Sequence, residues 1–561
     1  MLPGEIDRFE RAAPWCAGAF LALPVLIAKF PPMADVPLHE ASVGLLRHWG
    51  DRVFAPPSIY FVNLGHSNQL FSFLVFALSL ALPIAWATKL VVAAAVAALP
   101  VAAARFADHV GAPRWTALLV APMGLGWLFF WGLIQNIIGL SVLLASLPAI
   151  DVFATRPTGR GALRVCAALV LLHFAHQAMQ LVACAAIGFC GLGASWSLRA
   201  TGWRCMPVAF GIGVVYAAHQ YAWHFAGPVH QGTAPYLWVD LWHKVDAISG
   251  VLFGGFEPYI RNLILLLACI PVVWSLVVRC RARRGPRDES RWARLHAWRF
   301  EIFTLALLAI YFAAPANIKS TTLVYHRFLP PAWAIFAVSA ATGTASALRA
   351  VPRLICAALP IASVLVAWPS FVDSHRVYSG LAEVMKHMER GSSVACVDLG
   401  PDPPYRLWSP VAAMGHIVAE HGGRSLYDYS QSPISIVSQR PEKQWADIVE
   451  RATGRLYMIR PEWDLKRFRY LLIWTSQPTV AIAASLALRD DAKFVASSRD
   501  WYLFESTHTL VPIDSDDVPM TRPFPPSLRK LMDTVRKEIE DADRDGKPVA
   551  IPEELLQEFA H

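Results

Sequence analysis

The sequence has little charge for its length. Only 16% of its 561 residues are Asp, Glu, Lys or Arg, whereas 55% are hydrophobic and the mean hydropathy is +0.39. A soluble chain of this length would divide into several domains and carry more charge. The composition therefore excludes a soluble multidomain protein. Apolar runs recur from Trp15 to Trp368, and each needs only about 20 residues to cross a bilayer.

Cysteine pairs and a cleavable leader are also missing. The nine Cys include no CxxC pair, and Cys396 is alone in the C-terminal region, so we expect no disulfide within that region. The first apolar run, Trp15 to Phe30, lacks a small-residue cleavage site and is followed by Pro31-Pro32. We interpret it as a retained first span rather than a removed signal peptide.

The net charge of +8 does not come with a nucleic-acid motif. No stacking motif or basic helix of a nucleic-acid groove occurs, and much of the excess charge lies in short segments between apolar runs. Basic segments of this kind mark the cytoplasmic side of a membrane protein. We therefore place the N-terminus in the cytoplasm, together with segments 105–114, 156–164, 199–204, 279–294 and 349–353.

This topology constrains the number of spans. The apolar runs number twelve, but a cytoplasmic N-terminus and an extracytoplasmic C-terminal domain require an odd number of crossings. We predict eleven or thirteen spans, and expect the runs on either side of Pro83, within 67–104, to make a single crossing. The two long loops, 31–66 and 223–258, then lie outside.

From residue 371 onward the sequence is soluble in character. Strands are predicted at Val394–Leu399 and Tyr470–Trp474, a helix at Val480–Leu488 and a hairpin at Lys493–Ser506. We therefore predict a mainly α polytopic membrane protein: a transmembrane domain (1–370), a small extracytoplasmic α/β domain (371–510), and a charged, Pro-rich tail with a short helix (511–561). The α/β domain shows no Gly-rich phosphate loop and no Cys/His cluster, so we assign it no chemistry.

Two acids and a histidine, Asp35, His39 and Glu40, directly follow the first apolar run. An ionised carboxylate is disfavoured near lipid, so one interpretation makes Asp35 the reactive group of a membrane-embedded transferase. The other has Asp35 cap a helix that begins near residues 36–38, with Pro37 in its first turn. The two are compatible. For Glu40 the alternative to a catalytic role is a solvent-facing or capping acid.

Short polar motifs recur at the ends of later apolar runs. Besides the acidic stretch, they are Trp131-Gly-Leu-Ile-Gln135-Asn136, His173-Phe-Ala-His176 and Tyr325-His326-Arg327-Phe-Leu-Pro-Pro331. In this order, over most of residues 14–370, the chain resembles the GT-C class of membrane glycosyltransferases, in particular bacterial relatives of the protein mannosyltransferase and aminoarabinose transferase group. The Asp-Glu pair of many members is absent, because Val36 follows Asp35.

The resemblance implies a polyprenyl-phosphate-linked sugar as donor, transferred at the outer face of the bacterial inner membrane. Asp35 matches the position of the base that takes a proton from the acceptor, with His39 and Glu40 as further catalytic candidates. The leaving phosphate needs a cation or a metal. Arg327 is the first candidate, followed by His326, Lys319, His173 and His176. Arg327 could equally anchor its span by snorkelling, and the two His173-motif histidines could be ordinary interface residues.

Cofactor and acceptor stay open at this point. His residues in the loop 223–258 fit no standard metal-ligand spacing, so we predict no metal ligands, although a divalent ion is one possible source of the positive charge. The partners implied are membrane lipid, the lipid-linked sugar, and a glycan, lipid or protein acceptor. Two other functions compete with transfer: a lipid or polysaccharide transporter or flippase, suggested by polar residues within spans, and a non-catalytic envelope assembly protein, suggested by the missing second acid.

Overall fold

The chain forms two compact units in its computed structural model. The first comprises Met1–Met33, Gly65–Ala77 and Trp86–Phe371; the second comprises Ala34–Leu64, Leu78–Ala85 and Val372–His561. The loop that follows the first span therefore belongs to the same unit as the C-terminal domain, a grouping that the predicted boundary at 370 does not anticipate. The residues described are 3–192, 194, 197–226, 236–254, 257–282, 291–318, 323–344, 350–400, 410–425, 435–440 and 464–510.

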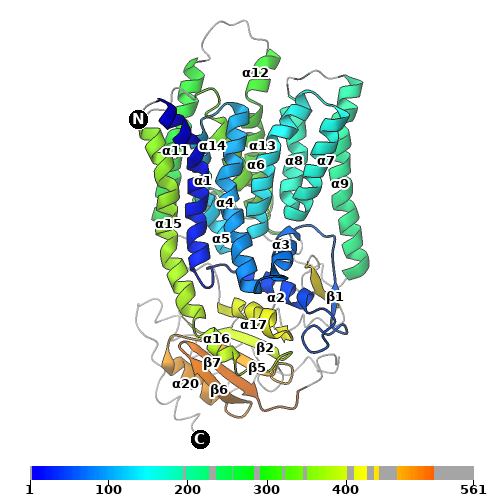
Figure 1. Cartoon of the computed structure of the whole chain (residues 1–561), viewed down its shortest axis with the longest axis vertical. Coiled ribbons are helices and arrows are strands. Elements are labelled where there is room, and N and C mark those ends of the chain that lie inside the picture. Colours follow the sequence, from blue (N-terminus) through cyan, green and yellow to red (C-terminus); the bar gives the residue numbers. More distant parts are fainter. Residues whose placement is uncertain are drawn as a thin grey trace. The chain divides into compact units, whose positions relative to one another are not determined.

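The first unit is built from apolar helices (Figure 1). The helices are α1 (Pro3–Ile27), α3 (Leu70–Ser79), α4 (Ile84–Val110), α6 (Ile134–Thr155), α7 (Gly159–Ala175), α8 (Gln177–Cys190), α9 (Leu198–Ala226), α10 (Leu241–Phe253), α11 (Pro258–Ala282), α12 (Arg291–Ala297), α13 (Arg299–Ala313), α14 (Leu329–Ser339) and α15 (Ala350–Tyr378). The boundary with the second unit falls within α3, α4 and α15.

Among the described helices, five are long and apolar enough to span a membrane, or six if the bent pair α12 and α13 is one span. The prediction of a multi-pass helical membrane protein is thus confirmed, while the total of eleven or thirteen stays a prediction. Around Pro83, α3 has only 10 residues and α4 has 27, so this region holds one helix of spanning length, as expected.

The apolar segment 115–131 is long enough to cross a membrane but is not one continuous helix. It consists of the short turns η1 (Arg114–Leu119) and η2 (Ala121–Leu125) and the single helical turn α5 (Trp127–Phe130). Pro122 lacks a backbone donor, and Gly124 and Gly126 add backbone freedom. Apolar composition alone therefore overestimates the regularity of this segment.

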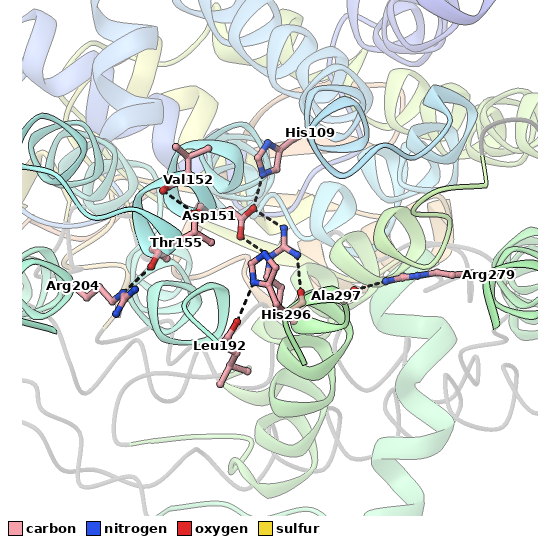
Figure 2. A network of polar contacts seen from close by, with 11 residues as sticks. His109, Asp151, Val152, Thr155, Leu192, Arg204, Arg279, His296 and Ala297 are labelled. Carbon is pink, nitrogen blue, oxygen red and sulfur yellow. Dashed lines mark hydrogen bonds and ion pairs between the residues drawn. The ribbon is translucent and has the colours of Figure 1, made fainter. Parts of the chain in front are cut away.

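A buried polar network joins helix ends of the first unit (Figure 2). Asp151, in the last turns of α6, accepts hydrogen bonds from Arg299 Nε and Nη2 at 2.6 and 2.7 Å and lies 2.8 Å from His109 Nε2. Arg299 also donates to the carbonyl of His296 at 2.7 Å. The contacts tie the ends of α4 and α6 to the start of α13.

Two further arginines make polar contacts at the same end of the first unit. Arg204 donates to the carbonyl of Ala154 at 2.7 Å, and Arg279 pairs with Glu301 and donates to the Ser339 carbonyl at 2.8 Å. The residues of this network lie in or near the basic segments 105–114, 199–204 and 279–294. These segments thus gather at one end of the unit, as the predicted topology requires; which side of the membrane they face stays a prediction.

The second unit contains a five-stranded sheet in the order β3-β2-β5-β7-β6. Its strands are β2 (Ser393–Asp398), β3 (Arg424–Ser425), β5 (Tyr470–Trp474), β6 (Ala492–Ser498) and β7 (Trp501–Ser506). β2 runs parallel to β3 and β5, whereas β7 is antiparallel to β5 and β6. The predicted strands and hairpin are confirmed. Both central strands, β2 and β5, are buried, which explains their unbroken apolar sequence.

Short helices complete the second unit. Among the described residues they are α2 (Val36–Arg47), α16 (Leu381–Met385), η4 (Pro410–Ala412), α17 (Ala413–His421) and α20 (Pro478–Ala487). α20 matches the helix predicted at 480–488 to within two residues. The tail 511–561, with its predicted helix, lies outside the described residues.

The first long loop, 31–66, is joined to the rest of this unit by strand pairing. Strand β1 (Tyr60–Val62) pairs antiparallel with β4 (Val437–Gln439). Asn63 supports the pair, because its side-chain amide donates to the Ser435 carbonyl and to Ser438 Oγ, both at 3.0 Å. The loop is therefore folded structure rather than a flexible connection between two spans.

Helix α2 packs directly against α17. A Cβ on Gly44 would lie 2.7 Å from the carbonyl oxygen of Ala419, and one on Gly415 would lie 2.2 Å from that of Pro37. Any larger side chain at either glycine would force the two backbones apart. This close approach fixes the register of α2 on α17, and with it the positions of the acidic residues on α2.

Candidate active site

Asp35 stands at the N-terminus of α2. It is the N-cap residue, with φ −90° and ψ −15°, and Pro37 follows in the first turn, as the capping interpretation predicts. The side chain, however, makes no capping hydrogen bond. Asp35 thus occupies the backbone position of a helix cap, but its carboxyl group does not bond the free amides of the first helical turn.

The carboxyl group of Asp35 is partly buried. Within the described part of the chain it makes no hydrogen bond and no ion pair. Burial disfavours the charged form and raises the pKa of Asp35 to about 7. A carboxyl group with such a pKa can both lose and accept a proton near neutral pH, which is the property that a general base needs.

His39 follows one turn later on α2 and is buried. Burial lowers the pKa of His39 to about 3, so its imidazole is neutral at physiological pH. The neutral ring has one donor and one acceptor nitrogen and adds no positive charge.

Glu40 is buried rather than solvent-facing, with 5% of its surface exposed, and it lies within α2 rather than at its cap. Its Oε2 atom lies 2.6 Å from Nδ1 of His416 on α17, and the ring of Tyr378 meets His416 edge-on at 5.3 Å. The alternative of a solvent-facing or capping acid is thus wrong for Glu40. His416 was missed in the sequence, because nothing local links it to a residue 376 positions away.

A second group of polar residues forms around the 3-10 turn η3 (Tyr325–Arg327) of the first unit. The ring of His326 stacks on Trp127 with centroids 5.0 Å apart and planes at 10°. Burial, with the nearby His243, Arg327 and Lys244, lowers the pKa of His326 to about 4. Both His326 and Arg327 remain partly accessible.

Lys244, on α10, is a cation that the sequence interpretation missed. Its Nζ donates to the carbonyls of Phe312 and Ala314 at 2.7 and 2.6 Å and lies over the ring of Tyr325. It thereby closes the C-terminal end of α13, where a cation is favoured, and holds the turn that carries His326. One signal could have found it: Lys244 is the only Lys or Arg between Arg204 and Arg261.

The predicted histidine motif lies at the junction of α7 and α8. His173 is in the last turn of α7 and bonds Gln180 at 3.1 Å, whereas His176 stands between the helices with an extended backbone. The two therefore do not share one helix face. His173 Nε2, His176 Nδ1 and His326 Nδ1 are buried without a hydrogen-bond partner among the described residues.

Arg327 is close enough to His176 to act on it electrostatically. Burial and the charge of Arg327 both lower the pKa of His176 well below its usual value. The structure thus brings His176, His326 and Arg327 into one part of the first unit. Asp35, His39 and Glu40 belong to the second unit, and Lys319 lies outside the described residues.

No family model matches the sequence, and no curated protein matches it significantly. The fold resembles that of ArnT from Cupriavidus metallidurans. For its apo state the TM-score is 0.46 and the identity 11%, with 86% of this chain and 95% of that chain covered. For ArnT bound to undecaprenyl phosphate the values are 0.48 and 12%, with 91% and 100% covered.

ArnT belongs to the aminoarabinose transferase group that the sequence motifs also resemble. Likeness at this identity and TM-score assigns no residue and no reaction to the chain. The roles of its residues follow from their own burial, contacts and charge.

Proposed function

We propose that the chain is an inner-membrane glycosyltransferase that uses a polyprenyl-phosphate-linked sugar. In this reaction the acceptor hydroxyl or amine attacks the anomeric carbon, Asp35 takes the acceptor's proton, and the bond from that carbon to the phosphate oxygen breaks. The polyprenyl phosphate leaves with the bonding electrons. The observation that carries the proposal is the Asp35 carboxyl group, partly buried, without a partner among the described residues, and with a pKa of about 7.

The polar group around η3 supplies what the leaving phosphate requires. Arg327 offers a permanent charge and a fork of donors suited to phosphate oxygens. His176 and His326 have buried ring nitrogens without partners in the described structure, and their lowered pKa values keep both rings neutral donors. We propose that these side chains receive the phosphate, with Lys244 positioning the turn and Lys319 and His173 as further members of the group.

The pH dependence of transfer tests the role of Asp35. Because the pKa of Asp35 is raised to about 7, the base is protonated and inactive below that pH and ionised above it. We expect the transfer rate, measured with saturating substrates from pH 5 to 9, to fall about tenfold per pH unit below 7 and to level off above it.

His39 provides an internal check on that profile. Since the pKa of His39 is about 3, its titration lies outside the range, and His39→Gln should leave the inflection near pH 7 in place. A profile that is flat from pH 5.5 to 8.5 would contradict the proposal.

Arg327 is tested by its affinity for the donor. Loss of a hydrogen bond to a charged group costs about 1.5–3 kcal/mol, so we expect Arg327→Gln to raise the KM for the lipid-linked donor about 10- to 100-fold, with partial recovery in Arg327→Lys. Arg353→Gln is the matched control, because Arg353 lies 3.6 Å from Glu10, away from the η3 group. If Arg327→Gln lowers only the unfolding temperature and leaves the KM unchanged, Arg327 is an anchor of its span.

A further inference from the structure

A cavity of about 410 Å³ lies within the second unit, between α2, α17 and residues 83–85 at the start of α4. Its volume falls in the range of small-molecule sites, about 300–1,000 Å³. Glu40 and His416 line it, and both are more than nine-tenths buried. The reaction proposed above uses neither this cavity nor His416.

Glu40 lines this cavity with a carboxylate that has one oxygen paired within the protein. One carboxylate oxygen, Oε2, is bonded to Nδ1 of His416 at 2.6 Å. The other oxygen has no hydrogen-bond donor within the described part of the chain. This second oxygen can accept an O–H or N–H group that a ligand brings into the cavity.

The geometry of the pair is fixed before any ligand arrives. The glycine contacts of α2 with α17 hold the helix backbones together at Gly44 and Gly415, and the ring of Tyr378 packs edge-on against His416. The backbone positions from which Glu40 and His416 reach the cavity are therefore fixed. A preformed site of this kind avoids the ordering cost that weakens binding.

The remaining walls indicate what kind of molecule fits. Arg47 and His48 supply donors, Glu420 supplies a second carboxylate, and Ile84 with Ala85 supplies an apolar surface. Two carboxylates against one permanent cation disfavour an anionic ligand. Donors and acceptors beside apolar side chains match a pyranose ring, which has hydroxyl groups at its edge and C–H groups on its face.

We infer that the cavity between α2 and α17 binds a neutral or amine-bearing sugar ring of the acceptor, with Glu40 accepting its O–H or N–H group. That the ring belongs to the acceptor rests on the proposed transferase function; that a sugar binds here does not. Glu40 follows Asp35 by five residues on α2, about 7.5 Å along the helix axis. The inferred acceptor site and the proposed base thus share one rigid element.

Binding is tested without any donor. Glucosamine, glucose and glucose 6-phosphate are titrated into the purified full-length protein, and binding is followed by saturation-transfer difference NMR. We expect glucosamine and glucose to bind with Kd values of about 1–10 mM and glucose 6-phosphate to bind at least tenfold more weakly. Glu40→Gln should remove the preference for glucosamine over glucose.

A cavity-filling variant locates the binding. Ala85→Trp fills the cavity from the first turn of α4 and should abolish the signal, whereas Ala81→Trp, at an exposed residue outside the lining, should retain it. Unfolding temperatures confirm that both variants are folded. Any one of three results would overturn the inference. They are no signal from either neutral sugar, an unchanged signal in Ala85→Trp, and tighter binding of glucose 6-phosphate than of the neutral sugars. Confirmed binding together with a fully active Asp35→Asn variant would uphold the sugar site and reject Asp35 as the base.

Discussion

Asp35→Asn is expected to lower the rate of sugar transfer by about 10²- to 10⁴-fold, the range that general acid–base catalysis contributes. Asparagine has the size of aspartate but cannot take a proton from the acceptor. Because Asp35 makes no cap hydrogen bond, the substitution removes no helix-capping interaction. The measurement is turnover of purified protein with a panel of synthetic polyprenyl-phosphate sugars, with products identified by mass spectrometry.

Asp51→Asn is the matched control in the same loop. Asp51 accepts hydrogen bonds from the backbone amides of Val53 and Phe54 at 2.8 and 3.1 Å, so it has a local structural role and no place in the proposed reaction. We expect it to retain turnover. Equal turnover in Asp35→Asn and the parent protein would remove Asp35 from the mechanism.

The stability of Asp35→Asn separates a catalytic defect from misfolding. The folded-state pKa of Asp35, about 7, lies above its ordinary value of 3.8. Folding therefore favours the protonated form, and the stability that this gives is present below pH 3.8 and lost as pH rises through 7. At pH 8 the Asn variant should unfold at the same or a higher temperature than the parent. Loss of activity with unchanged or greater stability is the pattern of a functional residue.

Asp151→Ala is expected to destabilise the first unit by about 3–5 kcal/mol, because removing one partner of a buried ion pair leaves the other charge uncompensated. Asp151 has only 4% of its surface exposed and is bonded to both His109 and Arg299. The loss appears as a lower unfolding temperature of the full chain in detergent micelles.

The double variant Asp151→Leu with Arg299→Met checks that mechanism. It removes both charges, so it should be clearly more stable than Asp151→Ala. The exposed pair of Asp108 with Arg114, at 2.6 Å, is the control, and Asp108→Ala should change stability by less than about 1 kcal/mol. Equal losses from the buried and the exposed substitutions would show that Asp151 is not a buried charge in the folded protein.

Much of the fold could be predicted because it depends on local signals. Spanning helices follow from runs of apolar residues, and β5 was predicted with its bounds from Tyr470–Trp474 alone. Asp35 could be singled out because a carboxylate beside an apolar span is unusual in any fold. The broken helix at 114–130 is the exception, since Pro122 and two glycines interrupt a run that is otherwise apolar.

Contacts between distant segments could not be predicted. The pairing of Glu40 with His416 depends on the close packing of α2 against α17, and no pattern within either helix indicates the other. Lys244 lies in the segment 223–258, a predicted outer loop, and its bonds to the end of α13 are visible only in the structure. Only the structure shows such long-range partners, and they determine where each candidate side chain lies.

The pairing of β1 with β4 bears on how the protein is made. Asn63 and its partner Ser438 are 375 residues apart, and synthesis at about 5–20 residues per second separates their emergence by roughly 20–75 seconds. During that interval the ribosome delivers the intervening helices to the translocon while α2 still lacks α17. Until then the loop 31–66 has neither α17 nor β4 to pack against. A chain truncated before residue 413 would lack both partners, and its loop would stay without them.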